Sequence, residues 1–283
     1  MTTYDPRTMP GGLDAELARL EAQAAVMWPA ERRLLESWGA GRAQVIADLG
    51  CGSGALLARL GDLNAGARLI GVDHDAALLS VAGDRCACPG LAGRVELVQS
   101  ELASLPLADG SVDLAVLRFV VQHLPDPVPV LAGVRRLLRP GGRVVVIDVD
   151  AELWGIAEPV DPVLAALHRR VWDVPGNGPA GPPERADRLV GRRLVRTLRA
   201  AGFAEPTTQV YSYDSDEFGV DAFGPLLDPV QLMPHVDAGT LSPAELADAV
   251  RRFRAWLARP DAYALLVGFA ATGIAPDPES LPR

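Results

Sequence analysis

The residues with the clearest chemical potential are three glycines that follow a short apolar run. The run at 44–48 ends in Asp48, and Gly50, Gly52 and Gly54 come directly after it. Glycines at alternate positions permit positive φ angles and let a ligand approach main-chain N–H groups without meeting a Cβ. When a helix begins directly after such a turn, its free N–H groups form an electropositive cradle. The pattern therefore predicts a ligand-binding loop, although Asp48 places an acid where an anionic ligand would be opposed.

The loop alone is compatible with more than one ligand. Gly50, Gly52 and Ala55 satisfy the G-x-G-x-x-A spacing of dinucleotide-binding turns, and Asp73 stands where an acid would hold ribose hydroxyls. Asp48 opposes a pyrophosphate but suits a ligand that carries a positive amino group. A tight turn that binds nothing is a third interpretation. The remaining segments must decide between these readings.

An alternating pattern of strands and helices positions the loop. Short apolar runs alternate with helical patterns, which is typical of a parallel, doubly wound sheet. We expect strands at 44–48, 68–73, 94–99, 112–117 and 143–148, and later strands at 207–213 and 263–272. Ligands of such sheets bind at the carboxyl ends of the strands, which is where the glycine loop lies.

Five stretches in a fixed order carry a family resemblance. They are the loop at 48–54, the strand-end acid in 71–73, the segments 99–113 and 117–124, and the turn at 138–142. Together they resemble the class I S-adenosylmethionine-dependent methyltransferases, closely over residues 35–150. The resemblance implies an α/β fold: a Rossmann-like, seven-stranded doubly wound sheet with N-terminal helices and helical cap insertions.

The same resemblance implies S-adenosylmethionine as the cofactor. Asp73 matches the acid that binds both ribose hydroxyls, and Glu101 stands where the family has an adenine-binding Asp. Asp48 would then answer the ammonium of the methionine part, and Arg118 would meet its carboxylate or a substrate anion. The expected cofactor residues are Asp48, Gly50, Cys51, Gly52, Asp73, His74, Ser100, Glu101, Leu102, Arg118 and His123.

Methyl transfer requires alignment, exclusion of water and, for an oxygen or nitrogen acceptor, loss of a proton. The candidates for a base are His123, after the fourth strand, and His168, on an apolar-faced helix after the fifth. A packing role is the favoured alternative for both. Asp148 and Asp150 end the fifth strand; contact with the substrate is one interpretation, and we expect instead that they face solvent.

We divide the chain into an N-terminal helical lid (1–40), a cofactor-binding core (41–150) and a C-terminal part (151–283). The last part would carry substrate-cap insertions and the last two strands of the same sheet. The expected activity is transfer of a methyl group to O, N or C of a small, secondary-metabolite-like molecule. Alternatives are a cofactor-retaining enzyme that does not methylate, such as a cyclase, and a nicotinamide-dependent oxidoreductase.

Composition narrows the class of partner. The 283 residues carry a net charge of −9, and all 27 basic residues are arginine. An acidic chain without a basic stripe argues against a nucleic-acid substrate. The three cysteines give neither a disulfide framework nor a metal quartet. We therefore expect a cytoplasmic enzyme that is a monomer or homodimer, without a metal, membrane span or signal peptide.

Overall fold

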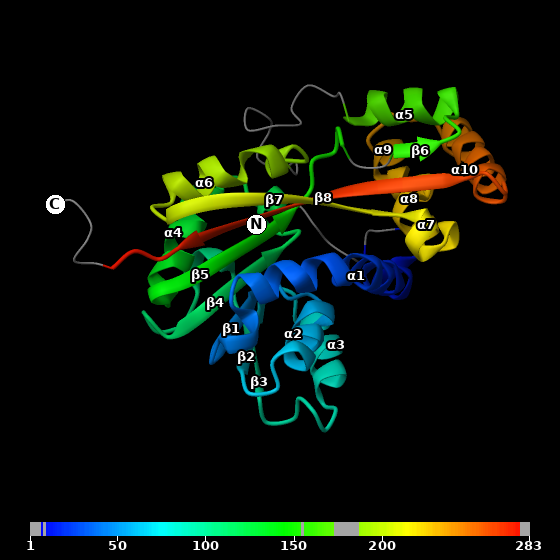
Figure 1. Ribbon diagram of the computed structural model, residues 1–283. Helices are drawn as coiled ribbons and strands as arrows, with labels where there is room; N and C mark the ends of the chain where they lie inside the picture. Colours follow the sequence, from blue (N-terminus) through cyan, green and yellow to red (C-terminus); the bar gives the residue numbers. More distant parts are fainter. Residues whose placement is uncertain (1–6, 8–9, 154–155, 173–186, 278–283) are drawn as a thin grey trace.

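The computed structural model describes Arg7 and residues 10–153, 156–172 and 187–277 (Figure 1). Most of residues 1–9 in the expected lid, and residues 154–155, 173–186 and 278–283 in the expected C-terminal part, therefore lie outside the described residues. None of the described helices combines the length and the apolar character needed to cross a membrane.

A mixed sheet forms the centre of the described chain, and its strands follow the order β3-β2-β1-β4-β5-β8-β6, with β7 also paired to β8. The strands β1 to β5 run parallel to one another, and β8 is antiparallel to β5, β6 and β7. The strands are β1 (Val45–Leu49), β2 (Arg68–Asp73), β3 (Val95–Gln99), β4 (Val112–Arg118), β5 (Leu138–Asp148), β6 (Ile156–Glu158), β7 (Ala204–Asp214) and β8 (Tyr263–Ile274).

Helices cover both faces of the sheet. The described helices are α1 (Gly12–Ser37), α2 (Ala55–Leu63), α3 (Ala76–Cys86), α4 (Pro127–Leu137), α5 (Pro162–Trp172), α6 (Leu194–Ala200), α7 (Ser215–Phe218), α8 (Gly224–Leu227), α9 (Met233–Asp237) and α10 (Pro243–Leu257). One apolar core joins the sheet to α4 and α6, and a second joins it to α1 and α2. The buried apolar strands have no solvated face, as expected of a doubly wound sheet.

The strands β7 (11 residues) and β8 (12 residues) extend past the core. Residues 269–274 of β8 pair with β5, whereas residues 263–265 continue beyond the end of β5 and pair with β6. Helices α5, α7, α8 and α10 gather around this extension (Figure 1). Their core includes stacked pairs of rings, Tyr213 with Phe223 and Phe253 with Trp256. The extension thus gives the helical cap a floor that is continuous with the sheet.

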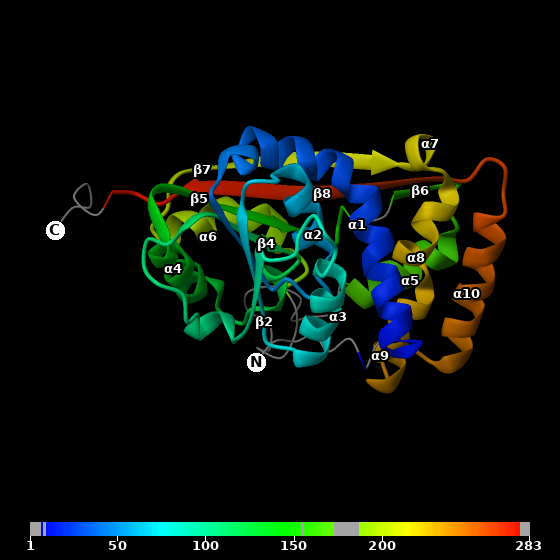
Figure 2. The ribbon, with the colours of Figure 1, turned by 90° about the horizontal axis from the view of Figure 1, so that it is seen from below.

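Helix α1 connects the core to the cap. It contacts α2, β7 and α8, and it lies between α2 and α8 in both ribbon views (Figures 1 and 2). Glu21 receives hydrogen bonds from Arg59 of α2 and Arg85 of α3, both at 2.6 Å. The helix is therefore held to the core by charged contacts as well as by apolar ones.

The expected fold class is confirmed. The seven strands predicted from the sequence are present, and the short strand β6 makes the described sheet eight-stranded. The sequence gave no strand signal for β6, because three residues are too few for a period-2 pattern. Residues 13–38, expected to hold one or two helices, form the single helix α1, which continues through Pro29.

Candidate functional site

The glycine loop turns sharply between β1 and α2 at the carboxyl edge of the sheet. Gly50, Gly52 and Gly54 have φ angles of 79°, 52° and 73°, which side-chain-bearing residues rarely adopt. A Cβ on Gly50 would lie 2.5 Å from Cγ2 of Val120, so the backbone approaches that side chain too closely for alanine. At Gly52 nothing lies within 4 Å of a built Cβ, so the second corner of the loop is open.

Asp73, the last residue of β2, fastens the loop. One of its carboxylate oxygens accepts a hydrogen bond from Gly52 N at 2.8 Å, and the other accepts from Asp75 N at 3.0 Å. The Nδ1 atom of His74 lies 3.2 Å from the second oxygen. Asp73 is 7% exposed, so it presents a pre-oriented acceptor at the rim of the open corner. The structure thereby brings together Gly52, Asp73 and His74, as the sequence predicted.

Asp48 lies beneath the loop and is almost completely buried. Its Oδ2 atom has no hydrogen-bond partner. Burial raises the pKa of Asp48, the charge of Arg118 lowers it and the charge of Asp73 raises it, and the net result is a pKa of about 7. A buried carboxylate without a partner is costly, and a cation brought close to it would remove that cost.

Cys51 is also buried, and its side chain points back against the sheet. Burial is the main reason that the pKa of the Cys51 thiol is raised far above its ordinary value, with Asp48 adding to the effect. A thiol that stays protonated is not a nucleophile. Cys51 therefore contributes packing, and its main chain, to the loop.

Arg118 ends β4, and its guanidinium is engaged by α1. Its Nε atom donates to the two carboxylate oxygens of Glu31 at 3.0 and 2.9 Å, and the group lies 4.7 Å from the centre of the Phe119 ring. Glu31 also accepts a hydrogen bond from Tyr211 Oη at 3.1 Å. Glu31 raises the pKa of Arg118 against the lowering effect of burial. The expected contact with the cofactor carboxylate therefore competes with an existing ion pair.

The segment after β4 is fastened to the end of β5. Gln122 N donates to Asp148 Oδ2 at 3.0 Å, and Arg188 donates to Oε1 of Gln122 at 2.6 Å. Burial raises the pKa of Asp148, and the net value is about 7 despite the lowering effect of backbone hydrogen bonds and of the charge of Arg188. The expectation that Asp148 and Asp150 face solvent is wrong, because both are fully buried and Asp150 pairs with Arg192. The sheet continues past them into β6 and the cap.

His123 lies in the turn that follows β4, in a partly buried position. Burial, together with the positive charge of Arg188, lowers the pKa of its imidazole to about 3. The ring is therefore neutral at physiological pH. An imidazole whose conjugate acid has so low a pKa is a weak base, which favours the packing alternative.

The adenine-side residues follow β3. Ser100 Oγ donates to the main-chain oxygens of Glu101 and Ser104, which shapes the short helical turn Leu102–Ser104. The Glu101 side chain is exposed and makes no capping bond. Its carboxylate is thus available at the carboxyl edge, two strands away from the glycine loop.

His168 lies in the cap, on α5. The neighbouring Leu167 and Val171 pack against α10 residues, and Arg170 pairs with Glu245 of α10 at 2.8 Å. Figure 1 shows α5 well separated from α2 and α3. Of the two predicted catalytic histidines, only His123 lies on the segment next to the glycine loop.

The sequence analysis did not single out Glu31, Gln122 or Arg188. For Glu31 a signal existed. Met27, Glu31 and Leu35 follow one another at four-residue spacing, and all three are buried on one face of α1. An acid within an apolar stripe indicates a buried cationic partner. The other two residues carry no such pattern.

The sequence and the fold are similar to those of known proteins. Residues 47–146 match a family model described as a methyltransferase domain. An uncharacterized 37.1 kDa protein in transposon TN4556 of Streptomyces fradiae is 37% identical over 163 residues, 56% of this chain and 43% of that protein. The 2-phytyl-1,4-naphtoquinone methyltransferase of Synechococcus elongatus is 33% identical over 120 residues, 42% of this chain and 52% of that enzyme.

Among solved structures, phosphoethanolamine N-methyltransferase 2 of Haemonchus contortus, in complex with S-adenosyl-L-methionine, has a TM-score of 0.56 and 16% identity. The match covers 90% of this chain and 56% of that chain, and at this identity it concerns the fold. The chain spans about half the length of the curated relatives it matches. Residues 47–146, which include the glycine loop, are thus similar in sequence to a methyltransferase domain.

Proposed function

We propose that the protein is a methyltransferase that moves a methyl group from S-adenosylmethionine to O, N or C of a small molecule. The observation that carries this proposal is the pairing of Gly52 N–H with the Asp73 carboxylate beside the unpartnered Oδ2 of Asp48. An open glycine corner, a fixed hydroxyl acceptor and a buried acid that lacks a cation together suit a ligand with ribose hydroxyls and a positive charge.

The residues of the carboxyl edge fit the cofactor. Asp73 would accept the ribose hydroxyls, because each of its oxygens keeps a lone pair after bonding Gly52 and Asp75. Asp48 would supply the counter-charge to the ammonium, and Glu101 would accept from the adenine amino group. His74, Ser100, Leu102 and the main chain of Gly50 and Cys51 would line the adenosine and methionine halves.

The chain itself would contribute the alignment of cofactor and acceptor and the exclusion of water. S-adenosylmethionine supplies an electrophilic methyl group on a cationic sulfonium, and the displacement needs alignment and exclusion of water. Helix α1, held by Glu21 and Glu31, would close one side of the site. The helices around the β7–β8 extension would close the other and receive the acceptor molecule. Burial lowers the pKa of His123 to about 3, so this ring is a poor base and an acceptor that ionises readily is favoured.

The chemistry of the acceptor is the second part of the proposal. The cap contains an aromatic and aliphatic cluster around Tyr213, Phe223 and Trp256. One relative is by its name a methyltransferase of a naphthoquinone. Both observations support a flat, apolar acceptor. The reported relatives lend no support to a cyclase or a nicotinamide enzyme.

The proposal is tested by calorimetry with S-adenosylhomocysteine. Native protein should bind it, and Asp73→Ala should reduce the affinity by at least about 100-fold, because a buried charge-assisted acceptor is lost. Glu96→Ala, an exposed acid on β3, is the matched control and should bind normally. Absence of binding to the native protein would overturn the proposal, and tight binding of reduced nicotinamide cofactor in its place would revive the oxidoreductase reading.

Transfer itself is followed with methyl-labelled cofactor and a panel of reduced quinones and phenols. Label in the acceptor supports the proposed reaction. Bound cofactor with no label in any acceptor, together with a changed but unmethylated product, would support the cyclase alternative.

A further inference from the structure

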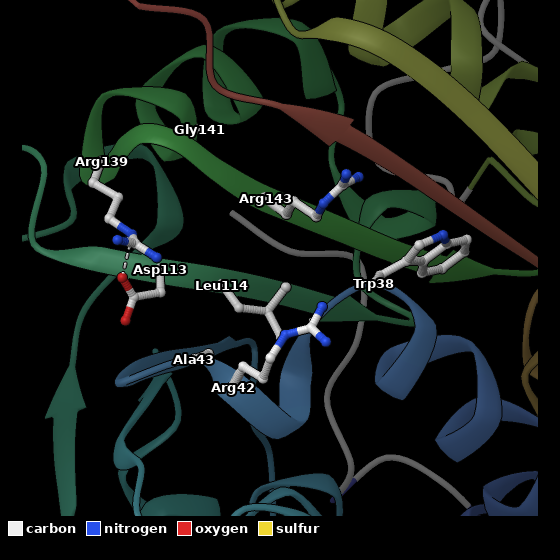
Figure 3. A pocket seen from close by; sticks show the side chains of 9 residues that line it. Trp38, Arg42, Ala43, Asp113, Leu114, Arg139, Gly141 and Arg143 are labelled. Carbon is white, nitrogen blue, oxygen red and sulfur yellow. Dashed lines mark ion pairs between the residues drawn. The ribbon is translucent and has the colours of Figure 1, made fainter.

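A pocket lies at the edge of the sheet opposite to the glycine loop. Its volume is about 160 Å³. It is formed where the end of α1 and the turn after it approach the beginnings of β4 and β5 (Figure 3). The lining residues are Trp38, Gly39, Arg42, Ala43, Asp113, Leu114, Arg139, Gly141 and Arg143.

The positive charge of the arginines that line the pocket exceeds the negative charge of the acids that pair with them. Asp113 pairs with Arg139, and its other oxygen accepts from the main-chain N–H groups of Gln44 and Val45 at 2.6 and 2.7 Å. Among the described residues, no acid pairs with Arg42 or Arg143. Three arginines against one aspartate leave an excess of positive charge in a protein whose net charge is −9.

The acids near this excess are already engaged. Glu36, in the last turn of α1, accepts a hydrogen bond from Arg32 at 3.0 Å. Figure 3 shows Arg42 and Arg143 on opposite sides of Leu114, with Trp38 at one end of the pocket and the Asp113–Arg139 pair at the other. The guanidinium groups of two arginines thus lie on either side of the apolar Leu114, and the indole of Trp38 closes one end of the pocket. A planar guanidinium group can donate two parallel hydrogen bonds to a carboxylate or a phosphate, and the face of an indole can stack on a flat ring.

We propose that this pocket binds a small aromatic oxyanion, a ring that bears one carboxylate or phosphate group. The volume of the pocket limits the class of ligand. A cavity of about 150 Å³ holds a benzene ring, and pockets for larger ligands begin at about 300 Å³. A whole nucleotide is thus too large. The oxyanion would lie between Arg42 and Arg143, and the ring would lie over Leu114 against Trp38.

The site is separate from the methyl-transfer site. Asp113 and Leu114 are at the beginning of β4, whereas Arg118 ends the same strand at the carboxyl edge. A strand rises by about 3.3 Å per residue, so the two edges are on the order of 15–20 Å apart. The inference therefore does not depend on the proposed function.

The probes are benzoate and phenyl phosphate, titrated by calorimetry and by ¹H–¹⁵N spectra of the tryptophan indoles. Trp38→Phe identifies the Trp38 signal. We expect that signal to shift on titration, and we expect the double variant Arg42→Gln/Arg143→Gln to bind at least 10-fold more weakly. Arg42 is exposed, Arg143 is partly exposed, and neither pairs with a described acid, so the variant should keep its melting temperature.

The control variant Arg251→Gln/Arg259→Gln removes the same charge from exposed arginines of the cap and should bind both probes normally. Benzyl alcohol, which has the ring without the charge, should bind at least 10-fold more weakly than benzoate. Equal binding of benzoate by native protein and by the pocket variant, or a shift of all indole signals together, would overturn the proposal. Binding of inorganic phosphate as tightly as phenyl phosphate would overturn the assignment of the ring to Trp38.

Discussion

The two ends of β4 differ in which charge is paired and in the sign of the charge that lacks a partner. At the carboxyl end, Arg118 is buried and committed to Glu31, and the charge left without a partner is the negative one of Asp48. At the amino end, Asp113 is committed to Arg139 and to two main-chain N–H groups. The charges left over there are the positive ones of Arg42 and Arg143 among the described residues. The same sheet thus carries an uncompensated negative charge at one edge and uncompensated positive charges at the other.

The difference lies in burial. The unpaired acid is 1% exposed, and burial raises its pKa to about 7, whereas Arg42 is exposed and keeps its hydration. A buried uncompensated charge costs more than an exposed one, so it persists only where something else needs it. The carboxyl edge therefore holds the more costly of the uncompensated charges.

Breaking the pair at the carboxyl edge should have the largest effect. Glu31→Gln leaves the Arg118 guanidinium buried without its counter-ion and weakens the bond from Tyr211. We expect a loss of about 3–5 kcal/mol in the free energy of unfolding, measured by urea denaturation. Glu36→Gln breaks the exposed pair with Arg32 and should cost less than about 1 kcal/mol. Equal costs for the two variants would contradict the contrast in burial.

Neutralising the unpaired acid should stabilise the protein while harming the site. The folded-state pKa of Asp48, about 7, lies above its ordinary value of 3.8, so the protonated form is favoured in the fold. Native stability then falls as pH rises from about 4 to 7 and stays low above that. At 1.36 kcal/mol per pKa unit the shift is worth at most about 4 kcal/mol. Because asparagine remains a buried polar group, we expect Asp48→Asn to gain about 2 kcal/mol at pH 8.

The same variant sharpens the assignment of the cation site. Ionised Asp48 should attract the ammonium of S-adenosylhomocysteine, so native affinity should rise with pH through about 7. In Asp48→Asn the affinity should be about 10-fold lower and should lack this rise. Calorimetry at pH 6 and 8 separates the two proteins, and parallel pH profiles would show that Asp48 does not face the ligand's charge.

At the amino edge the corresponding disruption should cost less. Asp113→Ala removes the acceptor of two main-chain N–H groups and the partner of the exposed Arg139. We expect a loss of about 1–2 kcal/mol, most of it from the N–H groups. Freeing Arg139 should also tighten benzoate binding in the pocket. Thermal denaturation and calorimetry measure the two effects, and weaker benzoate binding in the folded variant would contradict the charge argument.

The sequence predicted the loop, the strand-end acid and the sheet because each rests on local signals. Alternating glycines after an apolar run specify a turn, and Asp73 ends a run of buried residues. The pairing of Arg118 with Glu31 joins residues 87 positions apart, and that of Gln122 with Arg188 joins residues 66 apart. Such contacts depend on how α1 and the segment before α6 are packed, which no local pattern encodes. For the same reason Asp148 and Asp150 were expected in solvent.

The smallest effect concerns His123 at the carboxyl edge. Its pKa in the fold, about 3, lies below the ordinary value of 6.5, so the unfolded chain takes up the proton first as pH falls. Native stability is unaffected above pH 6.5 and declines below it, by about 1 kcal/mol between pH 6.5 and 5.5. His123→Gln should remove this part of the decline, seen as a smaller drop in melting temperature. The His123 ring signals should stay constant in NMR spectra between pH 8 and 5, because burial and Arg188 keep the ring neutral. A ring that titrates near pH 6.5 would instead restore His123 as a candidate base and require that the segment after β4 open to solvent.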